Sequence, residues 1–194
     1  MRNLVYYVAV TLDGFIAGPE NEVDFYPVGD DLSAWFNERV PEAVPTHIRE
    51  LVGLPADTPN RQWDTVLMGR ATYEPALAAG VASPYDHMKQ YVFSTTLAPV
   101  DNPQVEVVAG DPVELVRRLK KEEGLDIWLC GGANLAGQLI DEVDRLILKS
   151  YPVIAGAGIP LFAGGFHPTR FAVTERREFG NGTQVTWLDR MRSE

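Results

Sequence analysis

Two glycine-containing segments hold the residue types in this sequence that are best suited to chemistry. They are Met68-Gly-Arg-Ala-Thr-Tyr-Glu74 and Cys130-Gly-Gly-Ala-Asn-Leu-Ala-Gly137. Each follows a run typical of a buried strand and opens a segment of helical spacing. Glycine at such a corner lets the backbone approach a ligand, and the first-turn amides then point at that ligand without partners. Phosphate satisfies such amides, so two corners predict a ligand with several phosphates, hence a nucleotide cofactor.

The first corner adds side chains to the backbone donors. Amides around Gly69 and the Thr72 hydroxyl could bind phosphate oxygens, and the planar guanidinium of Arg70 suits a second phosphate. Ser94 and Thr95 end the next predicted strand, where their hydroxyls could hold a ribose 2′-phosphate beside Arg70. A purely structural interpretation stays open, because glycine corners with exposed arginines and strands that end in small polar residues are both common.

The second corner is the stronger signal. Paired glycines at 131 and 132, directly before Ala133 and Asn134, cost conformational entropy that a close approach must justify. The segment lacks the dinucleotide fingerprint of the doubly wound fold, which requires glycines where Ala133 and Ala136 stand. The common dinucleotide-binding fold is therefore excluded.

Other chemistries find little support. Cys130 has no histidine nearby in the sequence to activate it and is interpreted as an inert strand residue. The three histidines lie far apart without ligand spacing, so no metal site is expected, and no serine lies in a nucleophile elbow. The first candidate for a proton donor is Asp31, which can open the helix that carries Trp35, and Asp24 in the preceding loop is the second. For either one alone, a solvated carboxylate is the commoner outcome.

The segments that must position these residues alternate between strand and helix. The turn Gly180-Asn181-Gly182 then joins two strand-like segments, which predicts a hairpin. We expect one α/β domain over residues 1–194, with a mixed, mostly parallel central sheet flanked by helices and closed by a C-terminal antiparallel hairpin. The strands before the hairpin are expected at Leu4–Val10, Asp64–Met68, Gln90–Thr95, Gln104–Val108, Asp126–Cys130 and Val143–Val153.

The composition of the chain indicates which classes of partner to expect. The net charge of −10 argues against nucleic acid, since phosphate backbones need a basic face, but it leaves room for an anionic small molecule. A single cysteine fits a reducing compartment, and neither a signal peptide nor a membrane span is recognisable. We therefore expect a cytoplasmic protein with a small-molecule ligand and neither membrane nor nucleic-acid partner.

Five segments in order resemble the dihydrofolate reductase-like superfamily, most closely the reductase (C-terminal) domain of the bifunctional riboflavin-biosynthesis deaminase-reductase. The resemblance implies the superfamily's fold and an NADPH-dependent reductase. The segments are Ala9-Val-Thr-Leu-Asp-Gly-Phe-Ile-Ala17, Met68-Gly-Arg-Ala-Thr-Tyr-Glu74, Val92-Phe-Ser-Thr95, Gly131-Gly-Ala-Asn-Leu-Ala-Gly137 and Pro152-Val-Ile-Ala-Gly-Ala-Gly-Ile-Pro-Leu-Phe162.

The resemblance also implies roles for individual residues. A nicotinamide pocket would be lined from the first strand and the segment after it, while the two corners would hold the phosphates and the end of the next strand the 2′-phosphate. The implied cofactor-binding residues are Ala9, Ile16, Gly69, Arg70, Thr72, Ser94, Thr95, Gly131, Gly132, Ala133, Asn134 and Leu135. A homodimer is also expected, because reductase domains of this family commonly pair through the sheet region that the hairpin edge occupies.

Two departures from the family affect the substrate. One extra residue separates Asp31 from Trp35 compared with dihydrofolate reductases, and Cys130 stands where riboflavin reductases have a substrate-contacting glutamate. The leading hypothesis is hydride transfer to a small heterocyclic or ribosylamino-pyrimidine-type substrate, as in 5-amino-6-(5-phosphoribosylamino)uracil reductase. Dihydrofolate reductase activity and a non-catalytic NADPH-binding or sensing protein are the alternatives.

Overall fold

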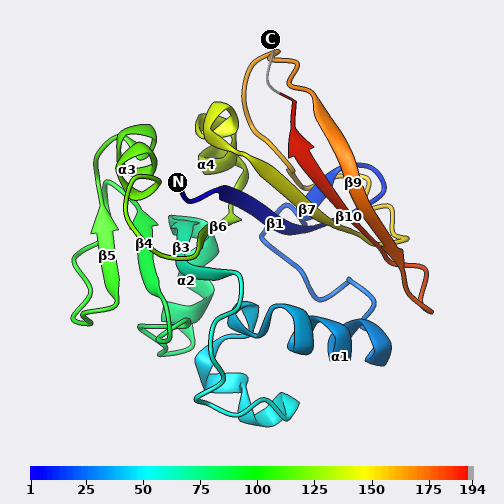
Figure 1. Cartoon of the computed structure of the whole chain (residues 1–194), viewed down its shortest axis with the longest axis horizontal. Helices are drawn as coiled ribbons and strands as arrows, with labels where there is room; N and C mark the ends of the chain where they lie inside the picture. The colour runs from blue at the N-terminus through cyan, green and yellow to red at the C-terminus, as the bar shows by residue number, and fades with distance from the viewer. Residues whose placement is uncertain (192–194) are drawn as a thin grey trace.

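The computed structural model describes residues 1–191, so the end of the expected domain at residue 194 lies outside the described residues. An eight-stranded sheet has the order β5-β4-β3-β6-β1-β7-β10-β9, and its first six strands are mutually parallel (Figure 1). Strand β10 runs antiparallel to both of its neighbours, β7 and β9. The strands are β1 (Leu4–Val10), β3 (Trp63–Gly69), β4 (Lys89–Phe93), β5 (Val105–Val108), β6 (Asp126–Gly131), β7 (Arg145–Ser150), β9 (Phe171–Glu178) and β10 (Gln184–Arg190).

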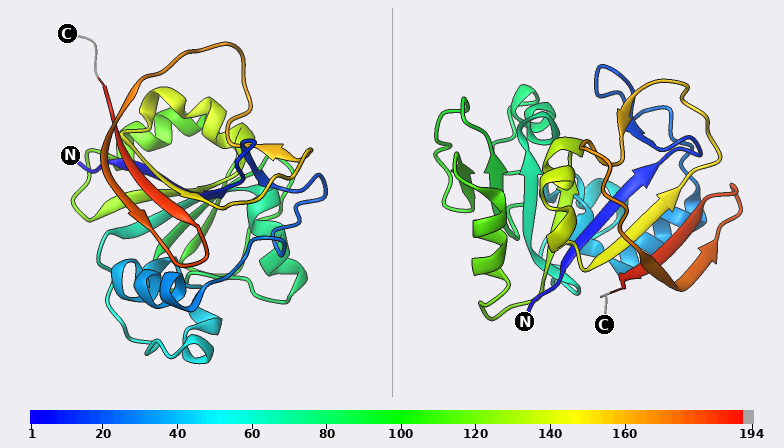
Figure 2. Two further views of the ribbon diagram at one scale, coloured as in Figure 1. Left: turned by 90° about the vertical axis from the view of Figure 1, so that its right-hand side faces the viewer. Right: turned by 90° about the horizontal axis from the view of Figure 1, so that it is seen from above.

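Helices cover both faces of this sheet (Figure 2). Helices α1 (Asp30–Arg39) and α2 (Arg70–Ala78) pack with one hydrophobic cluster, and α3 (Pro112–Leu119) and α4 (Ala133–Gln138) pack with the other. Strand β1 is apolar on both faces because it lies at the centre of the sheet, between β6 and β7. The predicted α/β architecture with its C-terminal antiparallel hairpin is confirmed.

A second, two-stranded sheet was not predicted. Strand β2 (Phe15–Ala17) pairs antiparallel with β8 (Ile159–Pro160), and β8 lies in a stretch of the sequence that is rich in glycine and proline. The Asp13 carboxylate fastens the same region, since it accepts hydrogen bonds from the amides of Ala155 (3.1 Å) and Gly156 (2.7 Å). The Thr11 hydroxyl and these amides lower the pKa of Asp13 to about 2. The segment after β1 is thereby held in place beside the end of that strand.

Local signals set the helix boundaries. Asp111 caps α3, because its carboxylate accepts a hydrogen bond from the Val113 amide at 2.8 Å, and Pro112 is the first helical residue. After α1 the prolines prevent a continuous helix, and the chain makes the short 3-10 turns Pro41–Ala43, Thr46–Ile48 and Glu50–Val52. A further 3-10 turn, Ile140–Glu142, follows α4. Within residues 1–191 no helix has the length and apolar character needed to cross a membrane.

Candidate cofactor and substrate site

The two glycine corners meet in the structure. Strands β3 and β6 are neighbours with Met68 opposite Gly131, so the turns that leave them lie side by side. A Cβ atom built on Gly69 would lie 3.4 Å from the Gly132 amide nitrogen, and one on Gly131 would lie 3.4 Å from the Thr72 hydroxyl. Gly131 also has φ +143°, which residues with side chains rarely adopt. The corners therefore form one continuous backbone surface.

This surface is rich in hydrogen-bond donors. Gly69 precedes α2 and Gly132 precedes α4, and no side chain caps either helix start. The half-buried Thr72 adds a hydroxyl between the two turns. Amides without caps, a hydroxyl and close backbone approach suit the phosphate oxygens of a nucleotide, so these residues fit a nucleotide cofactor. Ala133 and Leu135 are buried beside this surface, and Asn134 is exposed.

Arg70 lies against the loop that follows β4. Its guanidinium donates hydrogen bonds to the Thr96 hydroxyl and to Glu74 (2.6 Å). The Ser94 hydroxyl accepts from the Thr96 amide at 3.2 Å, and Thr95 is exposed between them. Because Arg70 and Glu74 are both about half exposed, their ion pair stabilises the fold by less than about 1 kcal/mol and can rearrange to meet an anion. The structure thus brings Arg70, Ser94 and Thr95 together and adds Thr96, which the sequence analysis missed.

The two residues expected at the nicotinamide pack with different hydrophobic clusters. Ala9 of β1 packs with the hydrophobic cluster beneath α1, and Ile16 of β2 packs with the cluster beneath α3 and α4. A site that both residues line would have to extend across the carboxyl end of β1.

The Asp31 side chain forms two hydrogen bonds at the start of α1. Its carboxylate accepts hydrogen bonds from the amides of Gly180 (2.9 Å) and Leu32 (2.8 Å), which ties the helix to the hairpin turn. The hydrogen bond from Gly180 is the main cause that lowers the pKa of Asp31, so the side chain is ionised at neutral pH. Asp24 is exposed in the loop before α1. The catalytic role suggested for either residue stays a prediction.

A charged cluster that the sequence analysis missed lies on the α1 face of the sheet. The Lys149 cluster consists of Tyr7 on β1, Phe36 on α1, Cys130 on β6 and Lys149 on β7. The Lys149 ammonium lies 4.3 Å from the Tyr7 ring centroid and 5.2 Å from that of Phe36. Such cation–π contacts are worth about 0.5–2 kcal/mol. Burial lowers the pKa of Lys149 to about 8.

The position of Lys149 connects this cluster to the expected cofactor site. Lys149 pairs with Ala9 in the register between β7 and β1. No hydrogen bond or ion pair joins the Lys149 ammonium to another of the described residues 1–191. Burial raises the pKa of the neighbouring Cys130 thiol to about 12, so the thiol stays neutral, consistent with the inert strand residue that was expected.

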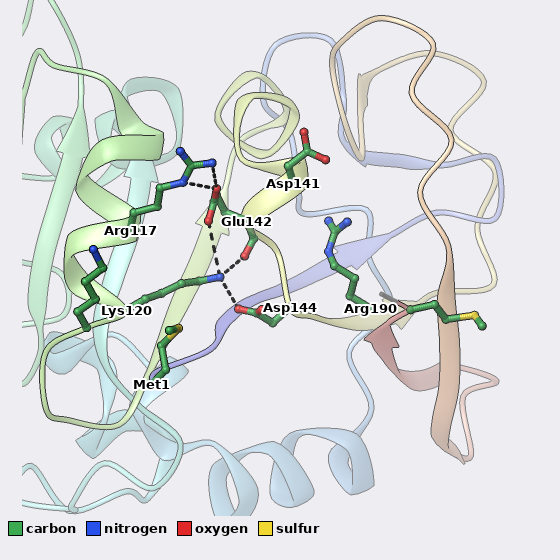
Figure 3. Close-up of a pocket in the computed structure, with 9 residues that line it drawn as sticks. Met1, Arg117, Lys120, Asp141, Glu142, Asp144 and Arg190 are labelled. Carbon is green, nitrogen blue, oxygen red and sulfur yellow. Dashed lines mark hydrogen bonds and ion pairs between the residues drawn. The ribbon is translucent and has the colours of Figure 1, made fainter. Parts of the chain in front are cut away.

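A hollow in the surface lies elsewhere, between α3, the Ile140–Glu142 turn and β10 (Figure 3). Its volume is about 530 Å³. Four of the charged groups that line it form ion pairs: Lys120 contacts Asp144 at 2.6 Å, and Arg117 contacts Glu142 at 2.7 Å. These residues flank the amino ends of β1 and β7, opposite to the glycine corners. Within residues 1–191 no group of three or more histidine, cysteine, aspartate or glutamate side chains is placed to hold a metal.

The central sheet and the paired corners define the class of this protein as a dihydrofolate reductase-like α/β fold. Residues 2–185 match the model of the RibD C-terminal domain, and the chain belongs to that family of reductases. The Bacillus subtilis (strain 168) protein YwjB, itself uncharacterised, is 29% identical over 96% of this chain and 98% of its own.

Solved structures that share the fold include a bifunctional deaminase-reductase and a dihydrofolate reductase. The Thermotoga maritima diaminohydroxyphosphoribosylaminopyrimidine deaminase/5-amino-6-(5-phosphoribosylamino)uracil reductase is 17% identical with a TM-score of 0.64, over 98% of this chain and 57% of that one. Dihydrofolate reductase from Enterococcus faecalis, in complex with NADP(H) and RAB-propyl, is 15% identical with a TM-score of 0.63, over 97% and 96% of the chains.

Proposed function

We propose that this protein is an NADPH-dependent reductase that acts on a small heterocyclic or ribosylamino-pyrimidine-type substrate. The observation that carries the proposal is the contact between the two glycine corners, with Arg70 and the loop after β4 at one side. Membership of the RibD C-terminal family supports reduction, and similarity to the 5-amino-6-(5-phosphoribosylamino)uracil reductase of Thermotoga maritima supports a pyrimidine substrate. The bound NADP(H) of the Enterococcus faecalis enzyme supports the cofactor.

Residues of both corners would hold the cofactor. Gly69, Thr72 and the turn from Gly131 to Leu135 would contact its pyrophosphate, while Arg70 with Ser94 and Thr95 would contact the 2′-phosphate. Ala9 and Ile16 would line the nicotinamide. When bound, NADPH supplies a hydride. The chain itself has to orient the substrate, exclude water and move a proton, for which Asp31 and Asp24 are the proposed carriers.

The proposed activity is tested by following NADPH oxidation across a panel of pyrimidines, ribosylamino-pyrimidines and dihydrofolate. Turnover of a pyrimidine supports the proposal, and turnover of dihydrofolate alone would replace it with folate reduction. Tight NADPH binding without turnover of any compound would favour the sensing protein instead.

We also propose a cytoplasmic homodimer. Strand β9 forms the edge of the sheet, and all its residues after Phe171 are exposed on both faces, including Val173 at 45%. An exposed edge of this length calls for a covering partner, and a second copy of the chain supplies one. A monomeric mass by light scattering at micromolar concentration would remove this proposal.

A further inference from the structure

The charged group that faces the proposed substrate side is a cation. Lys149 lies on the α1 face of the sheet, beside Ala9 and without a carboxylate partner among residues 1–191. Asp31, the proposed proton carrier, also holds the hairpin turn, because its carboxylate accepts a hydrogen bond from the Gly180 amide. An ammonium has three donors and no acceptor, so it binds oxygen acceptors and repels amino groups.

The surroundings of the ammonium are aromatic and partly exposed. Ala9, Phe36, Cys130 and Lys149 are all partly exposed, although β1 and β6, which carry Ala9 and Cys130, are otherwise mostly buried. The Tyr7 and Phe36 rings pack edge to face, with centroids 5.7 Å apart, and the ammonium lies against both. Aromatic surfaces of this kind suit a planar ring.

We propose that Lys149 is the specificity-determining residue of the substrate site, and that it selects planar heterocycles that present a carbonyl or enolate oxygen over those that present amino groups. The inference rests on the proposed function, because it places the substrate beside Ala9. Lys149 would then distinguish uracil-type rings, which offer oxygen acceptors, from diaminopyrimidine-type rings, which offer hydrogen-bond donors.

The charge of Lys149 can be changed by pH without disturbing its neighbours. The groups that face it are Tyr7 on β1 and Cys130 on β6, with Tyr85 and Tyr151 behind them, and burial raises the pKa of every one. A further charged residue, Arg177 on β9, lies in the same cross-strand row. The cation that disappears near pH 8 is therefore Lys149.

The test compares two probes that share one ring, 5,6-diaminouracil and 2,4,5,6-tetraaminopyrimidine, by ligand-observed NMR titration without cofactor. We expect the protein to bind the uracil at least about tenfold more tightly at pH 7, the size of one charge-assisted hydrogen bond. Lys149→Met should abolish this preference and Lys149→Arg should retain it, while Lys121→Met, at an exposed lysine far from the site, serves as the matched control.

The pH profile gives a readout that needs no variant. The preference of the protein for the uracil probe should fall as pH rises through about 8, while Lys149→Arg should keep it. A preference that survives Lys149→Met, a preference for the tetraamine, or no binding of either probe would overturn the inference. NADPH titration of the same samples separates the two claims: NADPH binding without uracil preference rejects the inference alone, and uracil preference without NADPH binding rejects the proposed function alone.

Discussion

Two regions of this molecule accommodate buried or partly buried charges in opposite ways. In the segment between α1 and β3, Glu42 and Arg49 are fully buried. The Glu42 carboxylate accepts hydrogen bonds from the amides of Gln62 (2.6 Å) and Trp63 (2.9 Å), and Arg49 donates to four backbone carbonyl oxygens. Lys149 has aromatic neighbours but no such partners within residues 1–191. A charge that the backbone fully satisfies holds the fold, whereas a charge left without a partner is available to a ligand.

The largest expected effect concerns Glu42, the buried carboxylate that accepts hydrogen bonds from backbone amides. Glu42→Ala should lower the free energy of unfolding by about 3 kcal/mol, because it leaves buried amides without an acceptor. Urea denaturation measures the change, and Glu38→Ala, at an exposed neighbour on α1, should change stability little. Equal stability of the two variants would break the comparison between the regions.

The next effect concerns Asp31, which has both a structural hydrogen bond and a proposed catalytic role. Asp31→Asn keeps an oxygen that can accept from the Gly180 amide but removes the proton carrier. If Asp31 supplies the proton, turnover should fall by about 10²-fold with unchanged NADPH affinity. Steady-state kinetics with Asp24→Asn in parallel measures this, and unchanged turnover in both variants would leave Asp31 with its structural role alone.

The pH dependence of stability follows from the same carboxylate. The folded state lowers the pKa of Asp31, so its contribution is present above the unfolded pKa and is lost as pH falls through the acidic range. The melting temperature of the Asp31→Asn variant should therefore fall less steeply with decreasing pH than that of the unsubstituted protein. Identical pH profiles would mean that the ionisation of Asp31 is not coupled to folding.

The smallest effect concerns the cofactor's second phosphate. Arg70→Ala should weaken NADPH by about 1.5–3 kcal/mol and NADH much less, because one charged contact to the 2′-phosphate is lost. Calorimetric titration of both cofactors measures the difference, and Arg117→Ala, in the hollow at the opposite end of the sheet, is the matched control. Equal losses for NADPH and NADH would show that Arg70 does not recognise the 2′-phosphate.

The sequence predicts the parts of this structure that depend on local signals. The glycine corners and the Asp111 cap are fixed by residues next to one another, and parallel pairing then brings the corners to one edge of the sheet. Contacts between distant residues were not predictable, such as the hydrogen bond between Asp31 and Gly180 or the pairing of β2 with β8.

Lys149 lies between these cases, because its signal was present in the sequence. In a strand, alternate residues face the same side, so Lys149 shares a face with Ile147 and Tyr151, which are buried. A lysine on the apolar face of a predicted strand is a conflict between local pattern and burial. Such conflicts are typical of functional sites, but only the packing of Tyr7 and Phe36 shows what surrounds the ammonium.

The central claim is that the two glycine corners form a single NADPH site, and a crystal structure determined after soaking with NADPH tests it most directly. The account predicts that the pyrophosphate lies between Gly69–Thr72 and Gly131–Leu135, with the 2′-phosphate against Arg70. A cofactor bound instead in the hollow beside Arg117 and Lys120, or none bound at millimolar NADPH, would contradict it.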